Sequence, residues 1–321
     1  IYTGEDTLSL HDALPIYQRE GLPISAETMI PMDNKERIEL LKGTSGMQAG
    51  TSAPGGLVNY VVKRAPTDAE QKIRNVTISY GDGNNRLVAA DLGGRFGNAA
   101  EFGYRFNLAH EDLNPYIKNA TGHRDLVALA MDFRINSDSK LEWEIEQSHR
   151  EQIGVNAYSL LGTSDPSTAA FPSSVNPRLN FTYQPWTQPQ VFDAFTSNIR
   201  FKQNLNNGWL WTTQVGAQHL RMDDRLSYAW GYDCHSNTCV NWDRFNPQGN
   251  FDLWDYRSEN ERRKTEVIQT ELTGTSSLSG FQHDLTFSVM RYRQLNRLPP
   301  MQAYNYAGTG NIDGTGTSTA A

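Results

Sequence analysis

The feature that most constrains the fold is a series of segments in which apolar and polar residues alternate. From Leu141 to Glu146 the odd-numbered positions are apolar and the even-numbered positions are glutamates. Successive side chains of a strand point to opposite faces, so this segment predicts a strand with one apolar and one polar face. Similar patterns predict strands over 73–80, 86–96, 102–108, 127–135, 192–203, 209–220, 265–277 and 282–295. The predicted fold class is all-β.

The connections between these strands are alternately short and long. Tight turns are expected at 97–100, 136–139, 206–208 and 279–280, and long polar links are expected at 113–124, 151–191 and 223–264. Short turns on one side and long loops on the other are typical of an antiparallel transmembrane β-barrel of the outer membrane. A soluble lectin-like β-sandwich is the alternative, but it would not be expected to show this regular alternation of short and long connections.

Composition is compatible with a barrel but does not decide the matter. The chain has a net charge of -7, a pI near 5.5 and a mean hydropathy of -0.60. A negative hydropathy suits a barrel, because only alternate residues of each strand meet lipid. The acidic balance argues against nucleic acid as a partner, since nucleic-acid-binding proteins usually present a basic face.

A compact block at 36–64 differs from the rest of the chain. Residues 37–41 predict a short buried strand, and 57–62 predict a second strand. Several glycines lie between them. They are typical of backbone turns that larger side chains would obstruct. Lys42 precedes these glycines and neither GxxxxGK nor GxGxxG is present, so the block is not a phosphate-binding loop. An ordinary glycine-rich hairpin is the alternative.

This block resembles the end of the plug domain in TonB-dependent outer-membrane receptors, and most closely that of the ferric-siderophore group. In that group a strand of the form ERIE-L-(K/R)-G leads to a GSGAPGG turn and an apolar strand that ends in Asn. The match covers 36–39, 42–43 and 50–59. The positions that carry the motif are Arg37, Glu39, Gly43, Gly50, Pro54, Gly55, Gly56 and Asn59.

The resemblance implies a domain organisation. Residues 17–72 would be the C-terminal part of a small α/β plug, and 73–321 would be the first part of a truncated barrel of the 22-stranded type. Residues 7–16 read TLSLHDALPI, which is the translation of a widely used sequencing adapter. We therefore expect residues 1–16 to be an artefact and the native sequence to begin near Tyr17. The stretch 308–321 is expected to be an exposed loop.

The resemblance also implies a function. The expected protein is an outer-membrane receptor of a Gram-negative bacterium that takes up a ferric siderophore, and it is not an enzyme. Its iron would travel in the chelate, without a resident cofactor. The implied partners are the TonB complex (whose contact segment would be missing here), outer-membrane lipid and lipopolysaccharide. A same-family receptor for cobalamin, haem or a glycan, and a passive porin, remain alternatives.

Candidate ligand residues cluster in the predicted long loops. Cys234 and Cys239 are close in sequence, and such cysteines usually pair in an oxidising compartment. A metal site with His235 is the alternative, but it would be one ligand short for zinc. In the hydroxamate-siderophore branch, the resemblance implies a disulfide-tipped loop after aromatic residues that face the ligand. The corresponding aromatic residues here are Tyr228, Trp230, Tyr232 and, in another loop, Tyr158.

One departure from the family pattern and one alternative role apply to these aromatic residues. A tryptophan expected two positions after Tyr158 is Leu160 here, and all four aromatic residues could instead pack within their loops.

Residues 110–112 read His-Glu-Asp, which we interpret as a solvated rim rather than a metal site. No metal site is predicted, and no GxSxG or HExxH motif is present.

Ion pairs between the plug and the barrel are a further expectation. Arg37, Glu39, Lys63 and Arg64 are the residues expected to form them. Buried pairs are costly to desolvate, so such contacts would fix the position of the plug more than they would stabilise it.

Overall fold

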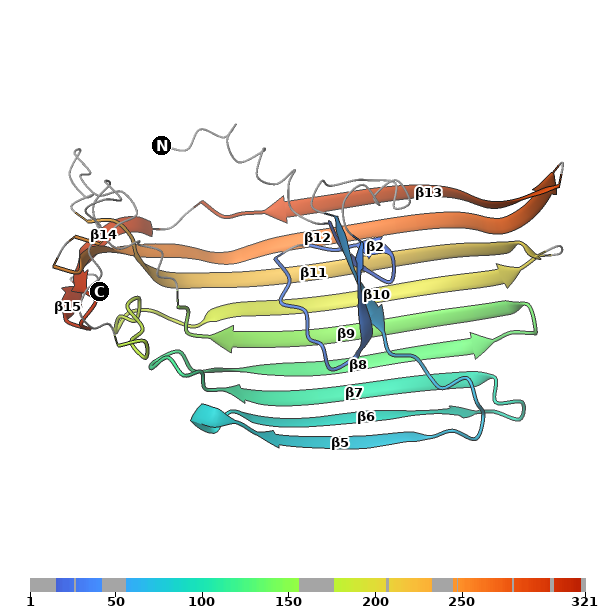
Figure 1. Ribbon diagram of the computed structural model, residues 1–321, viewed down its shortest axis with the longest axis horizontal. Coiled ribbons are helices and arrows are strands. Elements are labelled where there is room, and N and C mark those ends of the chain that lie inside the picture. The colour runs from blue at the N-terminus through green and yellow to red at the C-terminus, as the bar shows by residue number, and fades with distance from the viewer. Residues whose placement is uncertain are drawn as a thin grey trace.

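The computed structural model describes residues 16–25, 27–41, 56–155, 176–205, 208–232, 245–246, 248–278, 280–300 and 303–318. Figure 1 shows one large sheet of long strands and a much smaller sheet that lies across it. Among the described residues, no helix has the length and apolar character needed to cross a membrane. The fold class predicted from the sequence is confirmed, because almost every regular element is a strand.

The large sheet has eleven strands, and we call it the wall. Its strands are β5 (Ile73–Tyr80), β6 (Arg86–Phe96), β7 (Phe102–Leu113), β8 (Gly122–Arg134), β9 (Ser139–Gln152), β10 (Gln190–Asn204), β11 (Leu210–Ala229), β12 (Asn250–Leu278), β13 (Phe281–Arg297), β14 (Ala303–Asn311) and β15 (Gly316–Ser318). From β5 to β13 each strand pairs antiparallel with the next one in sequence. The first part of β12 pairs with β14, which pairs with β15. The wall is thus an antiparallel meander.

The unequal connections predicted from the sequence are confirmed. In Figure 1 the short turns after β6, β8, β10 and β12 lie at the right-hand end of the wall, and the other connections lie at the left. We call the left-hand end the loop end. At this end several strands are longer than predicted, so two expectations were wrong. Much of the link expected at 223–264 belongs to β11 and β12, and the exposed loop expected at 308–321 contains the end of β14 and all of β15.

The reason for these extra strands is burial that the local sequence does not reveal. Phe251 and Leu253 are buried at the loop end, where they pack with Ala307 and Ile312 from distant parts of the sequence. These contacts, together with backbone pairing between β12 and β14, hold polar and glycine-rich segments in an extended conformation.

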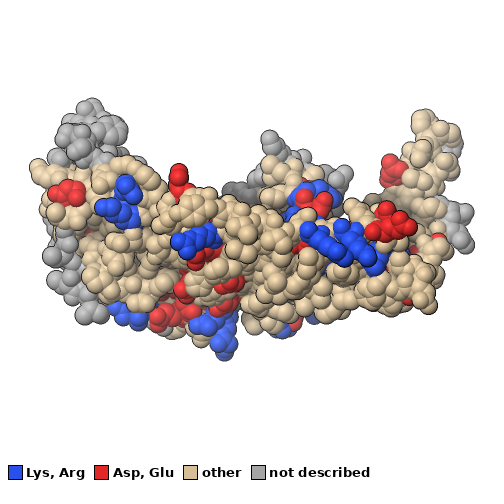
Figure 2. All heavy atoms as spheres, turned by 90° about the horizontal axis from the view of Figure 1, so that it is seen from below, with Lys and Arg blue, Asp and Glu red and all other residues tan. Residues whose placement is uncertain are grey.

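The two faces of the wall differ in chemistry. On β9, Glu142, Glu144 and Glu146 point to the face that carries the small sheet, and Trp143 lies on the opposite, outward face. Other apolar residues of the outward face are about half exposed, namely Val127, Ile199, Val215 and Ile268. Exposed apolar side chains in a continuous band are what a lipid-facing barrel surface requires. Seen over the β5 edge, charged side chains lie in small groups of mixed sign separated by wide uncharged areas (Figure 2).

The small sheet contains β1 (Ile16–Arg19), β2 (Leu22–Pro23), β3 (Lys35–Leu41) and β4 (Leu57–Val62) in the order β2-β1-β4-β3. β1 runs parallel to β4, and β3 runs antiparallel to it. The expectation that β3 is buried was wrong, because Ile38 and Leu40 are more than half exposed. β3 is one of the two edge strands of the small sheet, so one of its sides has no neighbouring strand in the sheet.

Glycines of the wall allow the small sheet to approach closely. A Cβ at Gly216 on β11 would lie 2.6 Å from Leu22 Cδ1 of β2. A Cβ at Gly103 on β7 would lie 2.7 Å from the Cβ of Ala65, which follows β4. A bulky side chain at either position would press on the small sheet or its connection.

Replacing Gly216 by leucine tests this close approach. The Gly216→Leu side chain overlaps Leu22, so β1 and β2 should lift from the wall and become accessible. We expect faster trypsin cleavage after Arg19 and Lys35, both buried in the structure, when the purified protein is digested in detergent. The control is Ala217→Leu, which introduces the same side chain on the opposite face. Equal cleavage rates for both variants would contradict the proposed packing.

Candidate functional site

The contact between the wall and the small sheet is made by buried charges. Glu142, Glu144 and Glu146 occupy alternate positions of β9 and are at most 4% exposed. Alternate residues of a strand lie on one face, so the three carboxylates form a row directed at the small sheet. Two of them meet cationic side chains from the small sheet, and the third is paired mainly by cations of the wall.

The centre of this row binds β1 and the start of β3. Arg19 Nε lies 3.0 Å from Glu144 Oε1, and Arg19 Nη1 lies 2.8 Å from Glu146 Oε2. Lys35 Nζ lies 2.7 Å from the same Glu146 oxygen, to which Asn34 Nδ2 also donates a hydrogen bond at 2.6 Å. Burial and the neighbouring Arg19 lower the pKa of Lys35 to about 8, although Glu146 acts in the opposite direction. Lys35 is therefore still charged at neutral pH, and its ion pair weakens above pH 8.

A second group of charges joins the turn after β1 to the wall. Glu20 Oε2 lies 3.2 Å from Arg64 Nη2 and 2.9 Å from Arg200 Nη1 on β10. Arg64 and Arg200 in turn reach Glu144 and Glu142, at 3.3 Å and 2.6 Å. Burial would raise the pKa of Glu20, but Arg64 and Arg200 outweigh it and hold that pKa below its ordinary value. Glu20 is therefore ionised at neutral pH.

Further ion pairs bind the margins of the small sheet. Asp33 pairs with Arg124 of β8 at 2.6 Å, and Lys63 Nζ lies 3.1 Å from Asp91 Oδ2 of β6. The expectation that Lys63 and Arg64 pair with the wall is confirmed. The same expectation was wrong for Arg37 and Glu39, which pair with each other at 2.7 Å. Both lie on β3, an edge strand of the small sheet, and both side chains are more than a third exposed.

Two motif residues have clear structural roles. Asn59 Oδ1 accepts a hydrogen bond from the Gly21 amide at 3.0 Å, and Asn59 Nδ2 donates to Glu39 Oε2 at 2.8 Å. Asn59 therefore ties both neighbours of β4 together. Gly56 has a φ of 98°, in the left-handed region that glycine adopts most easily. Gly43, Gly50, Pro54 and Gly55 lie outside the described residues.

A polar cavity of about 410 Å³ separates the small sheet from part of the wall. It is lined by charged and amide side chains from both sheets, including Glu39, Arg200, Lys202, Gln214 and Glu271. The interface thus combines buried ion pairs with a polar space that is open to solvent.

Tyr228 and Trp230, two of the predicted aromatic ligand residues, lie at the loop end of the wall. The Tyr228 ring packs edge-on against Tyr256, with ring centroids 5.7 Å apart. The Trp230 ring packs against Trp254 at 6.1 Å, and Trp254 packs against Tyr306 at 6.2 Å. We call these five residues the aromatic rim.

The aromatic rim includes three residues that the sequence analysis missed. Trp254 and Tyr256 lie in the first part of β12, within the long link expected at 223–264, and Tyr306 lies on β14, outside the predicted strands and loops. The alternation of apolar and polar residues around Trp254 and Tyr256 was the sequence signal that could have predicted a strand there. Tyr232 is half-buried just beyond β11. Tyr158, Cys234 and Cys239 lie outside the described residues.

Comparison with known proteins adds sequence and fold evidence. No family model matches the chain. The ferrichrome receptor FcuA of Yersinia enterocolitica is 30% identical over 189 residues, which are 57% of this chain and 23% of that protein. The ferric-pyoverdine BN7/BN8 receptor of Pseudomonas putida is 22% identical over 314 residues, which are 94% of this chain and 36% of that protein. The chain thus spans about a third or less of these relatives' length.

Solved structures share the overall fold of this chain. The open form of the ferric-catecholate import receptor Fiu from Escherichia coli K12 gives a TM-score of 0.73 at 18% identity, over 88% of this chain and 43% of that one. The siderophore receptor PiuA from Acinetobacter baumannii gives 0.72 at 16% identity, over 95% and 40%. The chain is similar in sequence and in fold to TonB-dependent siderophore receptors. These relatives are transport receptors of the Gram-negative outer membrane rather than enzymes.

Arginine-to-glutamine substitutions test the buried charges. Arg19→Gln leaves Glu144 and Glu146 short of a buried partner, which costs about 3–5 kcal/mol. We expect hydrogen exchange of the β1 and β4 amides to accelerate by about two to four orders of magnitude. Arg37→Gln makes the same charge change in an exposed pair, worth about 1 kcal/mol or less, and should accelerate exchange by less than about fivefold. Similar exchange in both variants would contradict the assignment of the anchoring role to Arg19.

Proposed function

We propose that this chain belongs to an outer-membrane receptor that takes up ferric siderophores by TonB-dependent transport. In this proposal 17–72 belong to the plug and 73–321 to the barrel. The single observation that carries it is the small sheet held against the inward face of an amphipathic meander by a row of buried ion pairs. A passive porin has no need of such an internal sheet.

The chemistry of the interface suits a plug that must move. A purely apolar interface would expose large apolar areas to water when the plug shifts, and this would oppose the shift strongly. Ion pairs beside a polar cavity can instead exchange their partners for water as the plug is displaced. The charges therefore define one resting position of the plug, and they allow the plug to leave that position and return to it.

The aromatic rim supports a bulky chelate as the ligand. Aromatic faces such as those of Tyr228 and Trp230 provide the broad contact area that a bulky chelate needs. Such contacts hold a complete chelate without competing for its iron, so the receptor itself needs no cofactor. The relatives named above are receptors for ferrichrome, pyoverdine and catecholate chelates. A ferric chelate of one of these classes is the proposed cargo.

Uptake of radioactive iron tests the proposal. The complete receptor gene is expressed in a Gram-negative host that lacks its own siderophore receptors, and cells receive ⁵⁵Fe in hydroxamate, catecholate or pyoverdine chelates. We expect uptake of at least one chelate, and loss of that uptake when TonB is deleted. Tyr228→Ala should weaken binding of the same chelate at least tenfold in a tryptophan-quenching titration. Trp211→Ala, on the outward apolar face, is the matched control and should leave binding unchanged.

The alternatives give different results in the same assay. Uptake that survives deletion of TonB indicates a passive pore. Binding of cobalamin, haem or an oligosaccharide, but of no ferric chelate, reassigns the substrate within the family. Either result would contradict the proposed function.

A further inference from the structure

A cluster of histidines and carboxylates lies on the outward face of the wall, near the loop end. The residues come from neighbouring strands: His110 from β7, His123 and Asp125 from β8, His149 and Glu151 from β9, and Asp193 from β10. The strand register places His123 opposite Glu151, and it places His149 between Asp125 and Asp193. These positions alternate with the inward-facing residues of the same strands, so the cluster lies on the same face as Val127 and Trp143.

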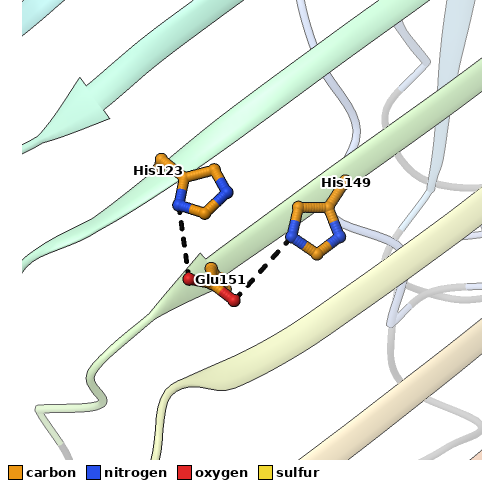
Figure 3. Close-up of side chains that lie close together, drawn as sticks. All are labelled: His123, His149 and Glu151. Atoms are coloured by element: carbon orange, nitrogen blue, oxygen red, sulfur yellow. Dashed lines mark ion pairs between the residues drawn. The ribbon is translucent and has the colours of Figure 1, made fainter.

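Three members of this cluster present donor atoms to one point. His123 Nδ1 lies 3.3 Å from Glu151 Oε1, and His149 Nε2 lies 3.9 Å from Glu151 Oε2 (Figure 3). One donor atom from each of the three residues lies within 4.8 Å of the other two. Zinc–nitrogen and zinc–oxygen bonds are about 2.0–2.2 Å long, so the donors around one ion are about 3–3.5 Å apart. Small rotations of partly exposed side chains close the remaining gap.

Neighbouring carboxylates already orient the rings. Asp193 Oδ1 lies 2.6 Å from His149 Nδ1, which fixes the Nδ1 proton and leaves Nε2 as the donor that faces Glu151. Metal-binding histidines almost always have such a carboxylate or carbonyl on their other nitrogen. Asp125 Oδ1 lies 2.7 Å from His110 Nδ1, and Asp125 Oδ2 lies 3.7 Å from His123 Nε2. Each of the two donor histidines therefore has an acid beside its second nitrogen.

We propose that His123, His149 and Glu151 form a binding site for a divalent transition-metal ion on the outward face of the wall. Two imidazoles and one carboxylate suit zinc, nickel or copper(II) rather than calcium or magnesium, which prefer oxygen donors alone. Three protein ligands leave one position of a tetrahedral ion for water or another small donor. Asp193 is a positioning residue in this site.

The site is distinct from the proposed transport function. It lies on the opposite face of the wall from the small sheet, and it does not depend on which chelate the receptor carries. A bound ion would connect β8 to β9 directly, and through His149 it would act on β10. It would therefore stabilise the loop end of the wall by mass action, in proportion to how tightly it binds.

The simplest competing explanation is that these residues form only a rim of ion pairs. In that case the acids would hold protonated histidines, and zinc would bind no better here than at any other surface histidine. The sequence alone favoured this explanation for residues 110–112, because it did not reveal that four strands bring their acids and imidazoles together.

Zinc titration of the purified protein in detergent tests the proposal. With competition against a chromogenic chelator, His123→Gln and His149→Gln should each lose one equivalent of bound Zn²⁺ relative to the wild type. Asp193→Asn should weaken the same equivalent by about 10–100-fold, as expected for a positioning residue. His219→Gln removes an exposed outward-facing imidazole on β11 outside the cluster, and it should keep the full stoichiometry.

Two further measurements separate a metal site from a structural defect. Electron paramagnetic resonance of bound Cu²⁺ should show nitrogen hyperfine coupling from two imidazoles, reduced to one in His149→Gln. Zinc should raise the thermal unfolding midpoint of the wild type and of His219→Gln, but not that of His149→Gln. Unchanged Zn²⁺ stoichiometry in both His123→Gln and His149→Gln, or equal midpoint shifts in all variants, would overturn the proposal.

Discussion

The structure depends on one electrostatic constraint, the row of buried glutamates on β9. Three carboxylates on a single strand face would repel one another and would be unstable without cations. Two of the glutamates find cations in Arg19 and Lys35 of the small sheet, and Glu142 finds them chiefly in the wall. Each sheet therefore supplies buried charges that neutralise those of the other. Wall glycines such as Gly216 provide the space for this contact.

This constraint also explains why the two faces of the wall have opposite chemistry. The inward face carries the charges that meet the small sheet, while the outward face keeps an apolar band at its middle. Near the loop end, the outward face becomes polar again and holds the histidine and carboxylate cluster. A single alternating pattern along each strand thus produces an inward face that meets the small sheet, an apolar outward band and a polar outward zone near the loop end.

Much of the fold could be predicted from the sequence, because alternation is a local signal. Residues 73–80 and 86–96 were predicted with the bounds that β5 and β6 have. The loop-end parts of β11, β12 and β14 could not be predicted, since their polar residues are held by pairing with distant segments. The anchoring residues divide in the same way. Lys63 and Arg64 were expected from their charge and position, whereas Arg19 and Lys35 became evident only when β9 was placed beside them.

Site chemistry was harder to predict than the fold. Arg37 and Glu39 belong to a recognisable motif, yet they lie on an exposed edge, because motif membership does not reveal which side of a sheet meets the wall. Two residues of the aromatic rim, Tyr228 and Trp230, were predicted from the sequence. Their ring partners were missed because they follow more than twenty residues later. Contacts between distant strands were the missing information in each case.

Disulfide trapping in intact outer membranes tests the central claim most directly. Leu22→Cys and Gly216→Cys place two thiols where the small sheet approaches the wall most closely, and mass spectrometry of the digested protein detects any linked peptide. We expect the 22–216 cross-link to form under mild oxidation, and no link when Ala217→Cys, on the outward face, replaces the Gly216 change. Failure of the 22–216 pair to cross-link, or equal linking of the 22–217 pair, would contradict the placement of the small sheet against the inward face of the wall.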